Sequence, residues 1–260
     1  MSRKVSGLLI DIDGTLITGD SRIEGARETL EWLSNKNIPF VLMTNTTRRS
    51  RITIWHQLQR LGFRIPEESI LTAPLAAIQY LKKHQVEKIH LMLSGSAVND
   101  FKDMKLTTAE AEYVVVGDLG KDLTFERLNT AFRLIMKGSK ILALQKNRFW
   151  QTEDGPTIDA GAIVAALEFA SGKKARLIGK PQKEFFKTAA DYLGLPLKKI
   201  AVIGDDLDAD VAGAKKAGML GIAVKTGKFT NYSAKDIEKA TPDFIIDSIA
   251  DLKKLADQLF

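Results

Sequence analysis

Short apolar runs alternate with segments of helical apolar spacing through the first and last thirds of the chain. The runs that fit buried strands are residues 5–10, 40–43, 199–203, 220–224 and 244–246. The segments with apolar residues three or four apart, which fit helices, are 25–35, 50–61, 182–193, 208–217 and 249–259. Strand and helix alternate in units of about 30 residues, which is typical of a parallel sheet wound with helices. We therefore predict an α/β fold with a doubly wound, Rossmann-like parallel-sheet core.

The middle of the chain carries a second set of elements. Its strand candidates are residues 89–93, 113–116 and 141–144, and its helix candidates are 75–83, 125–137 and 160–170. Thr124 is the expected N-cap of the helix that begins at 125. No low-complexity linker separates this part from its flanks, which indicates an insertion with two crossing points. We predict a discontinuous core of residues 1–73 and 178–260 and an inserted α/β cap domain of residues 74–177.

Composition and charge narrow the class of protein. The 260 residues are 45% apolar and 27% charged, which is ordinary for a globular chain, and the absence of cysteine excludes disulfides, thiol catalysis and cysteine zinc sites. The net charge of +6 is spread over short clusters, so we expect attraction for small anions and no nucleic-acid partner. The first ten residues lack the apolar region of a secretory signal, and no window resembles a membrane span. We therefore expect a cytoplasmic protein without membrane contact.

Four polar clusters follow strand candidates. They are Asp11–Thr15, Thr44–Asn45, Gly179–Pro181, and Gly204–Asp206 with Asp210. An open parallel sheet builds its site outside the carboxyl ends of its strands, so we expect these clusters to converge. Together they hold five carboxylates and one lysine, Lys180, and such an excess of acid repels strongly unless a cation is present. Mg²⁺ fits best, because it takes few carboxylates, keeps waters and adds substrate phosphate oxygens.

These four clusters, in this order and spacing, resemble the four motifs of the haloacid dehalogenase superfamily. The long insertion between the second and third motifs resembles the type IIA caps of the NagD and 4-nitrophenylphosphatase branch. Within that branch the chain is most similar to the phospholysine phosphohistidine inorganic pyrophosphate phosphatase group. The segments that carry this similarity are Thr44–Thr47, Gly179–Pro181 and Gly218–Gly221. The resemblance covers essentially the whole chain and implies a Mg²⁺-dependent phosphatase that forms a homodimer through the cap.

The first motif supplies the two catalytic residues that the resemblance implies. Asp11 is the nucleophile, whose attack on phosphorus divides one hydrolysis into two displacements. Asp13 is the general acid and base, a role that typically contributes about 10² to 10⁴ in rate. Dehalogenases of the superfamily lack an acid at this position, so Asp13 favours phosphate hydrolysis. The implied metal ligands are Asp11, the backbone carbonyl of Asp13 and the side chain of Asp205.

The remaining motifs supply the implied substrate contacts. Thr44 donates its hydroxyl to a phosphoryl oxygen, with the Asn45 amide beside it. Lys180 holds a fixed positive charge next to the phosphoryl group as that group is transferred. Asp206 and Asp210 lie four residues apart at a helix start, where they share a face. We expect Asp210 to hold a metal-bound water or to orient Lys180, with Asp206 in a supporting position.

Other interpretations stay open for single features and for the substrate. Taken alone, Asp13-Gly14 is a common turn, Thr44 is a helix cap and Lys180 is a surface lysine. Cleavage of P–N or pyrophosphate bonds is the alternative activity, and a non-catalytic phosphate-binding or scaffold protein is the alternative class. The polar run 145–150 either faces the active site, where Lys146, Asn147 and Arg148 select substrate, or forms a plain cap hairpin. The cap loops carry no motif that identifies the substrate.

Overall fold

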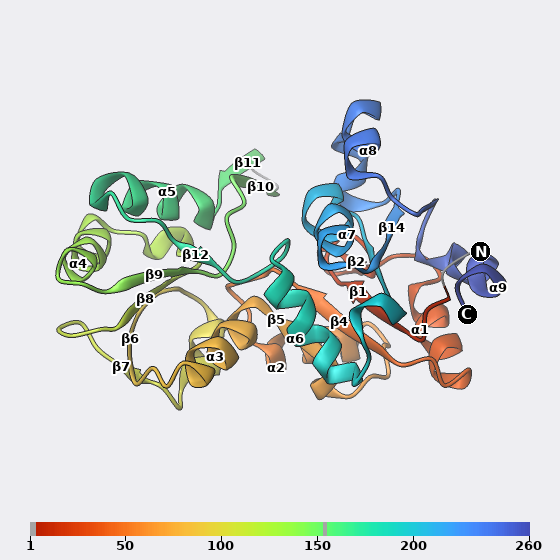
Figure 1. The fold of residues 1–260 in the computed structure, drawn as a ribbon, viewed down its shortest axis with the longest axis horizontal. Helices are drawn as coiled ribbons and strands as arrows, with labels where there is room; N and C mark the ends of the chain where they lie inside the picture. The colour runs from red at the N-terminus through yellow and green to blue at the C-terminus, as the bar shows by residue number, and fades with distance from the viewer. Residues whose placement is uncertain (1–3, 153–154) are drawn as a thin grey trace. The chain divides into compact units, whose positions relative to one another are not determined.

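The computed structural model describes residues 4–152 and 155–260, which form two compact units, each with its own sheet (Figure 1). The core unit comprises the chain up to Thr44, Ile54–Leu71 and Lys180–Phe260. The cap unit comprises Asn45–Thr53 and Thr72–Gly179. The sequence places residues 45–53 in the core, whereas their hydrogen bonds join them to the cap. The Thr47 hydroxyl accepts a hydrogen bond from Asp118 N at 2.9 Å, and Ser50 N donates to Ser96 Oγ at 3.0 Å.

The core unit is built on a six-stranded sheet in the order β15-β14-β13-β1-β4-β5. The strands are β1 (Gly7–Asp11), β4 (Phe40–Thr44), β5 (Ile70–Thr72), β13 (Ile200–Gly204), β14 (Leu220–Val224) and β15 (Phe244–Ile246). The β1 pairings are parallel and in register, with Leu9 between Val202 and Val41. Every β1 residue is buried, as expected for the central strand of a sheet covered on both faces.

Helices cover both faces of this sheet. They are α1 (Ala26–Asn35), α2 (Arg51–Arg60), α6 (Lys183–Leu193), α7 (Gly213–Ala217), α8 (Ala234–Ala240) and α9 (Ala256–Leu259). Leu8 and Ile10 of β1 join a buried cluster with residues of α1, α2 and the C-terminal segment. Leu9 points to the opposite face because side chains alternate along a strand, and α6 packs against β1 and β4. The prediction of a doubly wound, Rossmann-like core is confirmed.

The cap unit has a five-stranded parallel sheet in the order β12-β9-β8-β6-β7. Its strands are β6 (Lys88–Met92), β7 (Lys105–Leu106), β8 (Tyr113–Val116), β9 (Lys140–Ala143) and β12 (Arg176–Leu177). Its helices are α3 (Ala73–Lys83), α4 (Phe125–Met136) and α5 (Ala160–Ser171). Thr124 caps α4 as predicted, since its hydroxyl accepts a hydrogen bond from Arg127 N at 3.2 Å.

Some elements differ from the sequence-based expectation. The helix expected over 208–217 begins as a π-helix, Leu207–Ala212, and the closing helix over 249–259 begins as a 3₁₀ helix, Ile249–Leu255. The short ribbons β2 (Ile17–Thr18) with β3 (Ser21–Arg22), and β10 (Phe149–Thr152) with β11 (Gly155–Ile158), were not predicted as strands. None of the described helices combines the length and apolar composition that a membrane crossing requires.

Candidate active site

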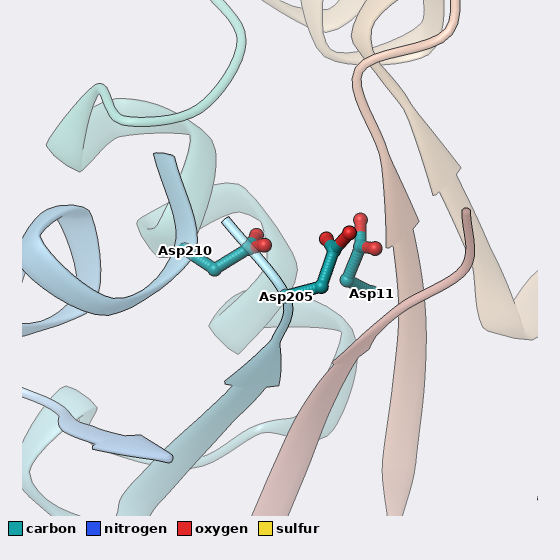
Figure 2. Close-up of side chains that lie close together, drawn as sticks. All are labelled: Asp11, Asp205 and Asp210. Carbon is teal, nitrogen blue, oxygen red and sulfur yellow. The ribbon is translucent and has the colours of Figure 1, made fainter. Parts of the chain in front are cut away.

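Three of the predicted acids meet at the carboxyl ends of neighbouring core strands. Asp11 is the last residue of β1, Asp205 follows β13 directly, and Asp210 lies in the π-helix that comes next. One carboxylate oxygen from each lies within 4.8 Å of the others, and Figure 2 shows the three groups converging. Their exposed fractions are 5%, 2% and 0%, respectively. The cluster is therefore a compact, buried set of oxygen donors.

Lys180 is the cation that this cluster contacts directly. Its Nζ donates to Asp11 Oδ1 and, at 2.6 Å, to Asp210 Oδ1. Burial by itself lowers the pKa of Lys180, but the charges of Asp11 and Asp210 outweigh it and raise the pKa above its ordinary value. The ammonium therefore stays protonated at neutral pH. The contact with Asp210 matches one of the two roles expected for that residue, the orientation of Lys180.

The three carboxylates still carry more charge than one ammonium balances. Burial raises the pKa of Asp11, and the Lys180 ammonium opposes that rise. Burial, with the nearby Asp210 charge, raises the pKa of Asp205 to about 7. A cation bound among the three groups would relieve both effects, because it replaces lost solvation and screens the repulsion. Buried carboxylate oxygens are also the donors that hard divalent cations take, so the residues present fit such an ion.

Asp13 lies beside Thr44 rather than in the buried acidic cluster. It is exposed to solvent, and its Oδ2 accepts a hydrogen bond from the Thr44 hydroxyl at 3.0 Å. Thr44 ends β4, the neighbour of β1, so the first two motifs are adjacent as predicted. Gly14 then turns the chain with φ +91°, and a Cβ at that position would overlap the Asp205 carboxylate. Asp13-Gly14 therefore forms a turn, and this turn lies in the candidate site.

Asn45 and the polar run 145–150 belong to the cap unit. The Asn45 side chain lies against Gly179, where an added Cβ would come 2.6 Å from Asn45 Oδ1. Lys146, one of the candidate selectivity residues, donates through Nζ to Glu168 Oε2 at 2.8 Å. The segment that follows forms the antiparallel ribbon β10–β11. Substrate contacts by Asn45, Lys146, Asn147 and Arg148 stay predictions.

Asp206 caps the π-helix that follows it. Its Oδ1 accepts hydrogen bonds from the backbone of Asp208 and Ala209, and its own N–H donates to Asp210 Oδ2 at 3.2 Å. The Lys228 ammonium donates to its Oδ2 at 2.9 Å and the Tyr232 hydroxyl to its Oδ1 at 2.9 Å. Burial alone raises the pKa of Asp206, but Lys228 and these hydrogen bonds bring it below its ordinary value.

One segment of the site lies outside the four predicted clusters, the loop that follows β14. This loop, Thr226–Lys228, contacts both Gly14 and Asp205. The loop shares the sequence signal of the four predicted clusters, because it is polar and follows a strand candidate. The loop contributes a hydroxyl and backbone groups, which the sequence pattern does not single out.

Two family comparisons agree with this arrangement. A model described as haloacid dehalogenase-like hydrolase matches residues 8–107, which include the first two motifs. A second, HAD-hydrolase-like, model matches residues 177–252, which include Lys180 and the Asp205–Asp210 segment. The two matched regions flank most of the cap unit.

Relatives and a solved structure match nearly the full length of the chain. The chain is 38% identical to the haloacid dehalogenase-like hydrolase domain-containing protein 2 of Homo sapiens, over 92% of this chain and 90% of the relative. It is 33% identical to the human phospholysine phosphohistidine inorganic pyrophosphate phosphatase, over 95% and 92% of the two chains. The p-nitrophenyl phosphatase from Archaeoglobus fulgidus aligns with a TM-score of 0.90 at 27% identity, over 96% and 99% of the chains. The resemblance to this branch is confirmed, although the 38% relative is nearer than the phospholysine phosphohistidine enzyme.

Proposed function

Because the chain belongs to the haloacid dehalogenase-like hydrolase family, we propose that it is a Mg²⁺-dependent phosphatase that works through an aspartyl-phosphate on Asp11. Its relatives include proteins named as phosphatases, which supports the enzyme class. The observation that carries the proposal is the buried set of Asp11, Asp205 and Asp210 around the Lys180 ammonium. The substrate that we propose is a small phosphorylated molecule.

The residues around Asp11 favour its action as a nucleophile. Lys180 and the Thr15 hydroxyl, at 3.3 Å, each donate to one of its carboxylate oxygens, which fixes the group and favours its ionised form. Attack by an Asp11 oxygen on phosphorus forms the acyl phosphate and breaks the bond to the leaving oxygen. Lys180 then stabilises the charge on the phosphoryl oxygens. Mg²⁺ held by Asp11, Asp205 and the Asp13 carbonyl would supply further charge neutralisation of the phosphoryl group.

Asp13 is suited to the proton transfers of both half-reactions. It is exposed to solvent and lies two residues from the nucleophile, and the Thr44 hydroxyl fixes one of its oxygens. In the first step its carboxyl proton passes to the leaving oxygen, which departs as an alcohol. In the second step the resulting carboxylate takes a proton from the water that attacks the acyl phosphate. Phosphate is released and Asp11 and Asp13 return to their starting states.

The first experiment measures 4-nitrophenyl phosphate hydrolysis with Mg²⁺ and with a chelator. We expect turnover that requires Mg²⁺ and is lost in Asp11→Asn. The matched control is Asp191→Asn, an exposed α6 carboxylate outside the site. Radiolabel from a labelled substrate should stay on the denatured wild-type protein and be released by hydroxylamine, as an acyl phosphate is. No turnover from folded protein would refute the proposal and favour a phosphate-binding or scaffold role. Activity above a few per cent in Asp11→Asn would reject Asp11 as nucleophile.

A second candidate activity is hydrolysis of P–N or pyrophosphate bonds. The 33% identity to a phospholysine phosphohistidine inorganic pyrophosphate phosphatase supports it. The acidic cluster and Lys180 act on the phosphoryl group, whereas the bond that is broken depends on how the leaving group is recognised. Imidodiphosphate, pyrophosphate and a panel of phosphate monoesters, assayed side by side, would separate the two activities by kcat/KM.

A further inference from the structure

The carboxylate of Asp205 is held by a backbone donor from the loop after β14. Lys228 N donates to Asp205 Oδ2 at 2.7 Å. A hydrogen bond from a backbone N–H to a carboxylate is one of the stronger protein hydrogen bonds, and here the accepting carboxylate is buried. It engages one oxygen of the group and leaves Oδ1 outside this bond.

Two glycines approach the same carboxylate more closely than any side chain would allow. Gly14 and Gly227 both adopt positive φ, +91° and +55°. A Cβ built on either one would overlap Asp205 Oδ2, and the Cβ of Gly227 would also come 2.7 Å from Gly14 Cα. The loops that carry the two glycines therefore meet at Asp205. The missing side chains are what let them do so.

The loop itself is fixed at three points. The Thr226 hydroxyl donates to Gly14 O at 2.5 Å, which joins the loop to the turn after the nucleophile. The Lys228 ammonium pairs with Asp206 at 2.9 Å. Phe229 is buried in a cluster with Leu207 and other apolar residues. The donor to Asp205 is therefore part of a restrained segment rather than of a free loop.

We propose that Thr226, Gly227 and Lys228 are positioning residues that set the carboxylate of Asp205 for the cation, an inference that rests on the proposed function. The Lys228 N–H fixes Oδ2, the two glycines let both loops approach the group closely, and Thr226 keeps the loop in place. Asp205 is thereby ordered before the cation arrives, and binding does not have to restrict it further. The segment thus contributes to the site mainly through backbone and one hydroxyl.

The test compares Mg²⁺ binding to the metal-free variants Gly227→Ala and Gly194→Ala by isothermal titration calorimetry. Gly194, at the end of α6, has a similar φ of +62° and no atom within 4 Å of an added Cβ. Both variants therefore carry the same kind of backbone strain, and only one displaces Asp205. We expect Gly227→Ala to raise the Kd for Mg²⁺ by about 10- to 100-fold, as outer-sphere changes at metal sites do. Gly194→Ala should leave the Kd within about twofold.

Thr226→Val and Thr226→Ser provide a second pair in case Gly227→Ala does not fold. Valine removes the hydroxyl at nearly constant shape and should raise the Kd, whereas serine restores the donor and should recover it. A merely structural role would lower the midpoint of thermal unfolding without changing the Kd, and that result would overturn the inference. Equal Kd values for Gly227→Ala and Gly194→Ala would overturn it as well.

Asp205→Asn separates failure of this inference from failure of the proposed function. If wild type binds Mg²⁺ and Asp205→Asn does not, while Gly227→Ala and Thr226→Val bind normally, only the positioning role is wrong. If wild type does not bind Mg²⁺, or Asp205→Asn binds it as wild type does, the metal site of the proposed function is wrong and the positioning role falls with it.

Discussion

The raised pKa of Asp205 predicts an unusual pH dependence for the stability of the metal-free protein. Burial and the nearby Asp210 charge raise this pKa from 3.8 to about 7. Because the folded state holds the proton more tightly than the unfolded state, the contribution of Asp205 to stability is greatest below pH 4. It decreases as pH rises between 3.8 and about 7, by up to about 1.4 kcal/mol per pH unit. The whole change corresponds to about 4 kcal/mol.

Asp205→Asn removes this ionisation, since the amide oxygen can still accept the Lys228 N–H but cannot ionise. The free energy of unfolding would be measured by urea titration, with a chelator present, at pH 5 and pH 8. From pH 5 to pH 8, we expect the free energy of unfolding of the variant to rise by a few kcal/mol relative to that of wild type. Saturating Mg²⁺ should stabilise wild type more at pH 8 than at pH 5 and should have little effect on the variant. A difference between variant and wild type that does not change with pH would refute the reasoning.

Three further predictions test other parts of the molecule. Lys180→Met removes the ammonium between Asp11 and Asp210, so kcat for 4-nitrophenyl phosphate should fall by at least about 10²-fold, and retained kcat would contradict its role. Phe63 is 1% exposed in the core cluster, so Phe63→Ala should lower the free energy of unfolding by about 3–5 kcal/mol in urea titration. A loss below about 1 kcal/mol would contradict this and show that neighbouring residues fill the cavity. Phe169→Glu tests the expected homodimer, because Phe169 is 92% exposed on α5 of the cap unit. Light scattering should report a dimer for wild type and a monomer for the variant, and a wild-type mass near the 28.7 kDa of one chain would contradict the expectation.

The side chains of the candidate site were predictable because they lie at the ends of strands. Asp11 and Asp205 each follow a continuous buried run, and parallel strands bring such ends to one edge. The doubly wound core follows from the same alternation of strands and helices. Lys180 was predicted through its resemblance to a motif. Its position between Asp11 and Asp210 depends on the tertiary structure and does not follow from the local sequence.

Features that depend on backbone geometry were not predictable from the pattern. Gly227 acts through its lack of a side chain and Lys228 through its backbone N–H. The spacing of hydrophobic residues along the chain reports neither feature. The π-helix arises where Asp206 caps the turn and its carbonyl accepts from Val211 N, a local contact that helical spacing does not report. Residues 45–53 read as a strand end and a helix start, but periodicity does not say which unit they pack against.

The central position of β1 has a consequence for folding during synthesis. β1 pairs with β4 on one side, but its other partner, β13, begins only at Ile200. At about 5–20 residues per second, β13 leaves the ribosome roughly ten seconds or more after β4. During this time one edge of a strand that is apolar up to its last residue, Asp11, stays unpaired, which is a hazard for aggregation. The cap unit between them is complete by Gly179 and has its own sheet, so it is free to fold first. The nascent chain therefore needs protection at β1 for longest, and a chaperone that binds early apolar segments should bind there.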